Sequence, residues 1–318
     1  MTKASAPVGW HGIIVDAPTD WSLVGISGDA KKGYFRVDSP VASALEVKWE
    51  SAGGKKPDLT VKAREFLSNI EKSVRKRKIK FTKDLKTEGE DTVRFLWRAD
   101  RLGQGRMTYC PDCDRIMIGQ LISTRDENVS RVGSEILDSM RDHRDDGWVE
   151  WALYELDFAV PPGYKIAKQT LMSGYIALTF KRGASTIVVE RWGLANTLVG
   201  HDTIEEWYRK DAMPDVKGYR ASFAPESTAG HEGLKVSGRR AGIQQAAKAL
   251  AYSLTLHPHP GLLTGYVWHC EDSNRLFSVR VTHAEGETIA ERIRDLIKCH
   301  QLPSLSRGGV GGEVPFPN

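Results

Sequence analysis

The sequence predicts an α+β protein made of two repeated domains, each an antiparallel sheet covered by helices. Two observations point to this fold class. Residues 10–143 and 148–300 align as two diverged copies of one unit. Within each copy, short segments rich in β-branched and aromatic residues come in runs, and a helical segment separates the runs. Runs of strands with helices between them are typical of an antiparallel sheet with helices packed on it.

Four pairs of matching segments carry the repeat. They are Pro18–Trp21 with Pro161–Tyr164, Gly33–Val37 with Gly174–Leu178, Lys48–Trp49 with Arg191–Trp192, and Tyr109–Ile116 with His269–Leu276. The alignment places the boundary between the copies near Arg144–Gly147. We therefore expect an N-terminal arm over 1–9, a first domain over 10–146, a second domain over 147–301 and a disordered tail over 302–318.

The first copy begins with four expected strands. Pro, Gly and Asp separate these segments, which are His11–Ala17, Trp21–Ser27, Tyr34–Val37 and Ala44–Glu50. Asp58 is a suitable N-cap for a helix over Leu59–Lys78, in which apolar residues recur at helical spacing. The rest of the copy is expected to form strands at Lys80–Leu85 and Thr92–Ala99, a hairpin over Arg106–Thr124 and a closing helix over Val129–His143.

The second copy repeats this order. Its expected strands are Tyr154–Val160, Tyr164–Thr170, Tyr175–Phe180, Ser185–Trp192, Tyr219–Ala224, His231–Arg239, Leu263–Cys270 and Leu276–Thr282. Asp202 is expected to open a helix over Thr203–Ala212, and Glu287–His300 is the expected closing helix. An insertion follows the sixth strand, with a helical pattern over Ala241–Tyr252 and then His257–Pro260.

Composition limits the class of protein. The chain of 318 residues is 40% hydrophobic and 27% charged, which is ordinary for a globular protein, and its net charge of +4 is weak evidence for a nucleic-acid partner. No apolar run approaches the roughly 18 residues that span a bilayer, so we expect no membrane partner. The first residues lack the apolar segment of a signal peptide, and four cysteines make no disulfide framework, which together favour the cytoplasm.

A short window at the start of the second copy carries a family resemblance. Phe158–Tyr164 reads Phe-Ala-Val-Pro-Pro-Gly-Tyr, and Val15–Trp21 is a looser version of it. The window and the order of elements resemble the Mog1/PsbP fold, in particular its bacterial DUF1795-type branch. Members of that superfamily are mostly binding proteins, among them a Ran-GTPase partner, photosystem extrinsic subunits and chaperones of type VI secretion effectors. The resemblance implies a non-enzymatic binding role and carries over no catalytic residue.

Cys110 and Cys113 form the sharpest local motif, a CxxC turn. Two thiolates at this spacing can hold zinc, but a closed site needs about four ligands. His269, Cys270 and Cys299 are the candidates for the others, across the interface between the copies. The alternative is an ordinary hairpin tip whose Pro-Asp makes the turn. A redox pair is less favoured, because the motif opens no helix that would lower a thiol pKa. We expect no cofactor, and zinc stays open.

Two further groups of residues could contact a partner. Lys72–Lys86 holds eight basic residues and one acidic residue, and Arg75, Lys76, Arg77 and Lys78 sit at the end of the expected helix. A solvated helix end explains such cations, since they suit the helix dipole, while an acidic partner or nucleic acid is the functional alternative. Phe316 is the apolar anchor in the tail. The pair His257 and His259 supplies only half a zinc shell.

The predicted function is a non-enzymatic protein-binding role, as a chaperone or adaptor. The chain has no GxxxxGK[ST], GxGxxG, HExxH or GxSxG motif. Three alternatives stay open, namely a metal-binding or thiol-redox protein using the CxxC turn, a nucleic-acid binder using the basic run, and an enzyme with a cleft between the copies. Strand alternation also predicts that Trp49 and Trp192 are buried at equivalent positions, each with the preceding basic residue facing solvent.

Overall fold

The computed structural model describes residues 4–124, 130–212, 218–240 and 260–300. Several sequence-based expectations lie outside the described residues. They are the inserted helix over Ala241–Tyr252, the pair His257 and His259, the tail over 302–318 and the candidate contact Phe316.

The first copy contains nine strands and two helices among its described residues. They are β1 (Ser5–Trp10), β2 (Ile13–Pro18), β3 (Ser22–Gly28), β4 (Lys32–Asp38), β5 (Ala44–Ser51), α1 (Leu59–Arg75), β6 (Thr82–Thr87), β7 (Thr92–Arg98), β8 (Leu102–Cys110), β9 (Arg115–Ser123) and α2 (Ser130–Asp138). Strand β1 takes in part of the segment that we expected to be an N-terminal arm.

The described part of the second copy follows the same order. It comprises β10 (Val149–Leu153), β11 (Leu156–Val160), β12 (Lys165–Met172), β13 (Tyr175–Arg182), β14 (Ser185–Gly193), α3 (Ala195–Val199), α4 (Ile204–Trp207), the π-helical turn η1 (Tyr208–Ala212), β15 (Tyr219–Pro225), β16 (Gly233–Arg240), β17 (Leu262–Cys270), β18 (Arg275–His283) and α6 (Ile289–Leu296).

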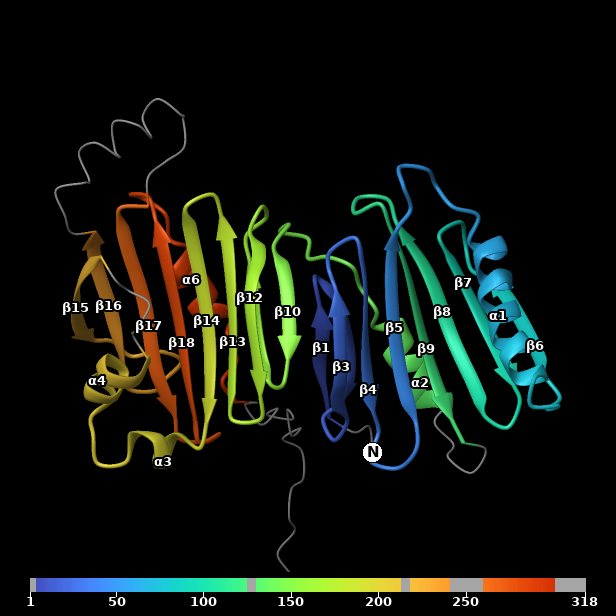
Figure 1. Cartoon of the computed structure of the whole chain (residues 1–318), viewed down its shortest axis with the longest axis horizontal. Helices are drawn as coiled ribbons and strands as arrows, with labels where there is room; N and C mark the ends of the chain where they lie inside the picture. Colours follow the sequence, from blue (N-terminus) through green and yellow to red (C-terminus); the bar gives the residue numbers. More distant parts are fainter. Residues whose placement is uncertain (1–3, 125–129, 213–217, 241–259, 301–318) are drawn as a thin grey trace, which may run out of the picture.

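Each copy builds a seven-stranded antiparallel sheet with the same strand order. The orders are β3-β4-β5-β9-β8-β7-β6 and β12-β13-β14-β18-β17-β16-β15. A third, four-stranded sheet has the order β11-β10-β1-β2, so each copy contributes one hairpin to it. Figure 1 shows the two large sheets at the ends of the molecule with the hairpins between them. The repeat seen in the sequence therefore appears as a repeated topology.

The expectation of two sheets each covered by helices is wrong. The described chain is mostly antiparallel sheet, and its closing helices are short, with nine residues in α2 and eight in α6. Much of the layer that packs on each large sheet comes from a hairpin. Val15 of β2 lies in the same core cluster as Val47 of β5 and Ile136 of α2. A twisted hairpin buries an apolar face as well as a helix does, so the pattern of strands and helices did not reveal this arrangement.

The two copies share one core. Strand β1 pairs with β10, and Gly9 lies opposite Ala152. The rings of Trp10 and Trp151 meet edge to face with centroids 4.7 Å apart, and both are almost fully buried. The largest hydrophobic cluster contains residues of both copies. The copies are therefore joined through strand pairing and a continuous core. The division into domains over 10–146 and 147–301 stays a prediction.

The register of the strands corrects one part of the repeat alignment. Arg115 and Arg275 occupy equivalent positions, opposite Cys110 and Cys270. Met117 and Phe277, each two residues after its arginine, are therefore also equivalent. Trp49 lies opposite Met117, and Arg191 lies opposite Phe277. Trp49 thus corresponds to Arg191 and not to Trp192. A shift of one residue moves every side chain of a strand to the other face of the sheet.

The shift changes what each side chain does. Trp49 is 2% exposed and belongs to the shared core, whereas Trp192 is only partly buried and packs against Trp207 of α4 on the opposite face. Lys48 is exposed as expected, but Arg191 is buried. The expectation of two equivalent buried tryptophans is therefore wrong for the second copy.

Helix starts follow local capping chemistry. The carboxylate of Asp58 accepts a hydrogen bond of 3.0 Å from the backbone N–H of Val61, so the expected cap of α1 is confirmed. Helix α4 starts differently from the prediction, because Thr203 and not Asp202 is its N-cap. The Thr203 hydroxyl accepts from the N–H of Glu206, whose carboxylate accepts from the N–H of Thr203, which makes a capping box.

Candidate functional site

A surface groove lies beside helix α2, and we call it the α2 groove. It encloses about 880 Å³ and is lined by strands β6 to β9, the segment just after β6, and α2. Helix α1 packs on the opposite face of these strands, where Leu67 and Val74 cluster with Phe95 and Trp97. Because α2 is short, it leaves the outer strands of this face open.

The floor of the α2 groove is apolar. Leu96 of β7 lies opposite Gln104 of β8, which in turn lies opposite Leu121 of β9, so these side chains share one face of the sheet. Leu121 and Leu137 are buried, whereas 47% of Leu96 is exposed. A large apolar side chain exposed on the face of a strand, next to an apolar hollow, is typical of a binding surface.

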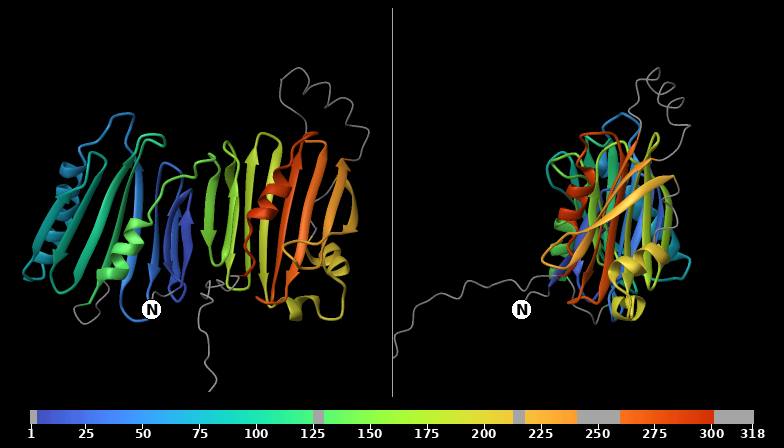
Figure 2. Two further views of the ribbon diagram at one scale, coloured as in Figure 1. Left: turned by 180° about the vertical axis from the view of Figure 1, so that it is seen from behind. Right: turned by 90° about the vertical axis from the view of Figure 1, so that its left-hand side faces the viewer.

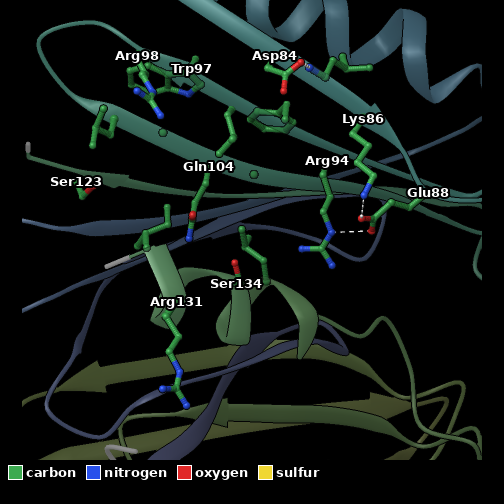
Figure 3. Close-up of a pocket in the computed structure, with 18 residues that line it drawn as sticks. Asp84, Lys86, Glu88, Arg94, Trp97, Arg98, Gln104, Ser123, Arg131 and Ser134 are labelled. Atoms are coloured by element: carbon green, nitrogen blue, oxygen red, sulfur yellow. Dashed lines mark hydrogen bonds and ion pairs between the residues drawn. The ribbon is translucent and has the colours of Figure 1, made fainter. Parts of the chain in front are cut away.

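The rim of the α2 groove carries more positive than negative charge. Its charged lining residues are Asp84, Lys86, Glu88, Arg94, Arg98 and Arg131. Figure 3 shows Arg94 and Lys86 turned toward Glu88, and Gln104 pointing toward α2. Arg94 also pairs with Asp138 at the end of α2. Arg98 is exposed and has no ion pair within the described part of the chain. Arg131 pairs with Glu135 of the same helix, and Asp84 has no ion pair among the described residues. The lining thus holds four basic and two acidic side chains, and its unpaired charges are those of Arg98 and Asp84.

The second copy lacks the apolar centre of the groove. The matched arginines Arg98 and Arg239 occupy equivalent register positions, opposite Leu102 and Leu262. Two residues earlier on the same face, the first copy has Leu96 and the second has Ser237. The arginine at this position is thus common to both copies, while the exposed leucine belongs to one of them.

A second hollow lies at the junction between the copies. It encloses about 550 Å³, and its lining includes Arg141, Glu150, Asp157 and Lys298. Arg141 pairs with Glu150 at 2.9 Å and with Asp16 at 3.2 Å. Burial, with a further contribution from the charge of Glu150, raises the pKa of Asp157 from 3.8 to about 6. A carboxyl with a raised pKa can exchange protons near neutrality, and the described lining of this hollow includes no serine, threonine or cysteine.

The candidate metal ligands do not come together as one set. Cys110 and Cys113 lie near His143, while Cys270 lies near His231, Cys299 and His300. The β8–β9 turn with Cys110 is at the upper edge of the molecule in Figure 1, and the β17–β18 turn with Cys270 is at the lower edge. His269 belongs to neither group, because neighbouring residues of a strand point to opposite faces.

One thiol in each group has a raised pKa. Burial raises the pKa of Cys113 to about 12, with a further contribution from the charge of Asp142. Burial and the neighbouring Cys270 raise the pKa of Cys299 to about 11. Redox cysteines need a lowered pKa, so these environments do not favour the thiol-redox alternative.

The basic run is partly neutralised by nearby carboxylates. Arg75 and Lys83 both pair with Glu71, and Arg77 pairs with Asp100 at 2.7 Å. Lys76 and Lys78 are exposed and have no ion pair among the residues that the structure covers. The run therefore adds positive charge at the end of α1 and along β6, the edge strand beside the α2 groove.

The comparisons with known proteins are sparse. No protein-family model matches the chain, and no curated protein matches it. Among solved structures, the chain is similar to an immunity protein. This protein is TplEi of T6SS from Pseudomonas aeruginosa, in a structure complexed with "L" peptide. The two chains are 10% identical with a TM-score of 0.28, and the alignment covers 92% of this chain and 95% of that chain. The apo structure of TplEi gives 8% identity and a TM-score of 0.30, covering 92% and 96%.

A further structure, DynU16 from the dynemicin biosynthetic locus, aligns at 10% identity and a TM-score of 0.15, covering 87% of this chain and 93% of that chain. Scores this low carry no argument about fold or function. The resemblance to the Mog1/PsbP fold is not confirmed by any of these comparisons. In the described residues, no helix is long and apolar enough to cross a membrane.

The sequence analysis did not identify several residues that the structure places in the groove or in the cluster of candidate metal ligands. Leu96 looked like an ordinary strand residue, and its exposure depends on how short α2 is. His231 joins Cys270 and Cys299 only through tertiary contacts. One signal was available, because His143 and His300 end the two aligned copies just beyond the closing helices.

Proposed function

We propose that this protein is a non-enzymatic binding protein whose α2 groove takes a peptide segment of a partner protein, one that combines apolar side chains with acidic ones. The observation that carries the proposal is the exposed Leu96 on the groove floor, beneath a rim that has four basic and two acidic side chains. Apolar anchors supply affinity, and complementary charge supplies orientation and rate of association.

The dimensions and chemistry of the groove support a binding role. A volume of about 880 Å³ is within the range of sites for peptides and other ligands. The lining residues in the described structure include neither a histidine nor a cysteine, which are the commonest general base and thiol nucleophile. We place the protein in the cytoplasm as part of the same proposal, on the sequence evidence alone.

The test is selection from a displayed library of random peptides on the immobilised protein, followed by affinity measurement with synthetic peptides. We expect the selected peptides to pair apolar residues with Asp or Glu. Leu96→Ser copies Ser237 of the second copy and should weaken binding by about tenfold, which is the effect of losing roughly 1.4 kcal/mol of apolar contact. Arg98→Glu should weaken binding of the acidic peptides by a similar factor.

A matched control is available in the second copy. Leu198 of α3 is 43% exposed, close to the 47% of Leu96, so Leu198→Ser removes an equally exposed leucine outside the groove. This variant should bind the selected peptides like the wild type. Failure to select any peptide, or equal binding by Leu96→Ser and the wild type, would contradict the proposal. Tighter binding to duplex or single-stranded DNA that Lys76→Glu abolishes would instead favour the nucleic-acid alternative.

A further inference from the structure

The strongest cluster of metal-binding side chains lies in the second copy, far from the α2 groove. His231, Cys270, Cys299 and His300 each offer one ligand atom, and these four atoms all lie within 4.8 Å of one another. Cys270 and Cys299 are buried, and both histidines are partly buried. Two cysteines and two histidines are a complete ligand set for a closed tetrahedral zinc site.

The spacing of the ligand atoms fits such a site. The His300 Nδ1 atom lies 3.2 Å from Nε2 of His231 and 3.4 Å from each of the sulfur atoms of Cys270 and Cys299. A tetrahedral ion with bonds of about 2.0–2.1 Å to nitrogen and 2.3 Å to sulfur holds its ligand atoms about 3.3–3.8 Å apart. The three distances to Nδ1 of His300 are therefore within a few tenths of an ångström of those that zinc requires, and the other pairs of ligand atoms lie within 4.8 Å.

Three separate segments are positioned to make the cluster. Cys270 ends β17 at its tight turn to β18. His231 closes a short turn in which Thr228 and His231 exchange backbone hydrogen bonds of 2.9 Å, with positive φ at Ala229 and Gly230 as in a type I′ turn. Cys299 and His300 follow α6, and Arg294 of α6 pairs with Glu226 at 3.3 Å. This ion pair holds the end of α6 close to the His231 turn.

The first copy provides an internal comparison. Cys110, Cys113 and His143 also form a group, but it has three ligands and His143 is exposed. The residue before His143 is Asp142, where the second copy has Cys299 before His300. Asp142 is engaged in a buried ion pair with Arg115, which also donates to the carbonyl of Asp142. The carboxylate is thus committed to the arginine, and the first copy lacks the fourth ligand.

We infer that His231, Cys270, Cys299 and His300 bind one structural zinc ion, which ties the end of α6 and the turn after β15 to the end of β17. Zinc is the metal that a tetrahedral set of two sulfur and two nitrogen ligands favours. The ion would add to the contacts that already join these segments, among them the pair of Arg294 with Glu226 and the hydrogen bond of 3.0 Å from the Tyr266 hydroxyl of β17 to Glu291 of α6. Because such sites form only in the folded chain, zinc binding also stabilises this end of the second copy.

The first test is the metal content of the full chain, purified without a histidine tag and under reducing conditions. We expect about one zinc per chain in the wild type and less than about 0.1 in the variant Cys270→Ser/Cys299→Ser. The matched control is Cys110→Ser/Cys113→Ser, which removes the pair in the first copy and should keep its zinc. Asp272→Asn is a second control, because its carboxylate lies 3.7 Å from Nδ1 of His300 without belonging to the ligand set.

The second test covers the case in which the double variant fails to fold. His231→Ala changes a partly buried turn residue, and circular dichroism verifies that the variant is folded. In titrations with cobalt(II), the wild type should show the visible bands of tetrahedral thiolate coordination, and His231→Ala should bind the ion more than about 100-fold more weakly.

Three results would overturn the inference. One is a wild-type chain that carries no zinc and shows no tetrahedral cobalt(II) spectrum. Another is zinc that the Cys110→Ser/Cys113→Ser variant loses and the Cys270→Ser/Cys299→Ser variant keeps. The third is a disulfide between Cys270 and Cys299 in the freshly purified protein, which would leave only two ligands.

Discussion

At the scale of single residues, two buried ionisable groups of the central sheet have pKa values shifted in opposite directions. Burial raises the pKa of Asp157 to about 6 and lowers the pKa of His11 to about 4. His11 lies in the β1–β2 turn with its ring against Trp10 and Trp151. The two groups therefore make opposing contributions to the pH dependence of stability between about pH 4 and 6.5.

Asp157→Asn should isolate the contribution of the carboxyl group. Because the folded pKa lies above the ordinary value of 3.8, the folded state binds the proton more tightly. Its stabilising contribution is present below about pH 4 and is lost as the pH rises through 6. Urea unfolding from pH 4 to 7 should show the variant gaining about 2–3 kcal/mol relative to the wild type. A constant difference across this range would mean that Asp157 titrates normally.

His11→Asn should show the opposite sign. The folded pKa lies below the ordinary 6.5, so protonation favours unfolding and stability is lost as the pH falls from about 6.5 to 4. Asparagine tolerates the positive φ of 54° at this position. The wild type should lose about 2–3 kcal/mol relative to the variant over this window, measured by the same urea series. If the variant shows the same dependence of stability on pH as the wild type, the imidazole is hydrated in the folded protein.

The two tryptophans that looked equivalent should respond unequally to truncation. The Trp49 ring lies over Gly33, where an added Cβ would come within 2.1 Å of it, and Nε1 donates to the carbonyl of Asp29 at 2.8 Å. Trp49→Ala should therefore cost about 3–5 kcal/mol. Trp192→Ala, which removes a partly exposed ring stacked on Tyr175, should cost about 1–2 kcal/mol. If denaturant melts show that both variants lose the same free energy of unfolding, Trp49 and Trp192 are equivalent as the alignment assumed.

At the scale of elements, α4 shows that capping chemistry selects the first residue of a helix. Thr203→Ala removes the hydroxyl that accepts from the N–H of Glu206 and should cost about 1 kcal/mol. Asp202→Ala, at the position expected from the sequence, should change the free energy of unfolding by less than about 0.5 kcal/mol. Thermal melts of the two variants measure the difference, and the reverse order would return the cap to Asp202.

The N-cap of α1 was predicted correctly from the sequence, whereas that of α4 was predicted one residue too early. Asp58 was identified as the N-cap of α1 because its side chain can accept a hydrogen bond from the N–H of a residue three positions away. The buried face of α1 was predicted less well, since Leu59, Ala63, Leu67 and Val74 are buried while Val61 is 46% exposed. Helical spacing identifies an apolar stripe, but its edges depend on the curvature of the sheet beneath.

At the scale of the whole molecule, the shared core predicts that the copies unfold together. Trp151 contacts Trp10 of the first copy and Phe180 of the second, with ring centroids 4.7 and 4.9 Å apart. Trp151→Ala should cost about 3–5 kcal/mol and should lower hydrogen-exchange protection in β5 of the first copy as well as in β14 of the second. Protection that falls only in β14 would show two independently folding domains.

The sequence by itself determined the repeat, the strand-rich character of each copy and local features such as the Asp58 cap. These depend on residues close together in the chain or on the period of one strand, so the pattern is sufficient. The equivalence of Arg115 with Arg275 was also predicted, because the two residues lie in the matched segments Tyr109–Ile116 and His269–Leu276.

Only the tertiary structure decided which partners meet across the chain. Pairing of β1 with β10 joins the copies, and the short α2 leaves Leu96 exposed beside the groove. The fold also brings His231 to Cys270 and Cys299, whereas the sequence analysis had placed His269, Cys270 and Cys299 with Cys110 and Cys113. The physical reason is the same in each case. The alternation of residues in a strand specifies its two faces, but long-range packing sets its register and the layer that covers each face. A shift of one residue in the register exchanges the two faces.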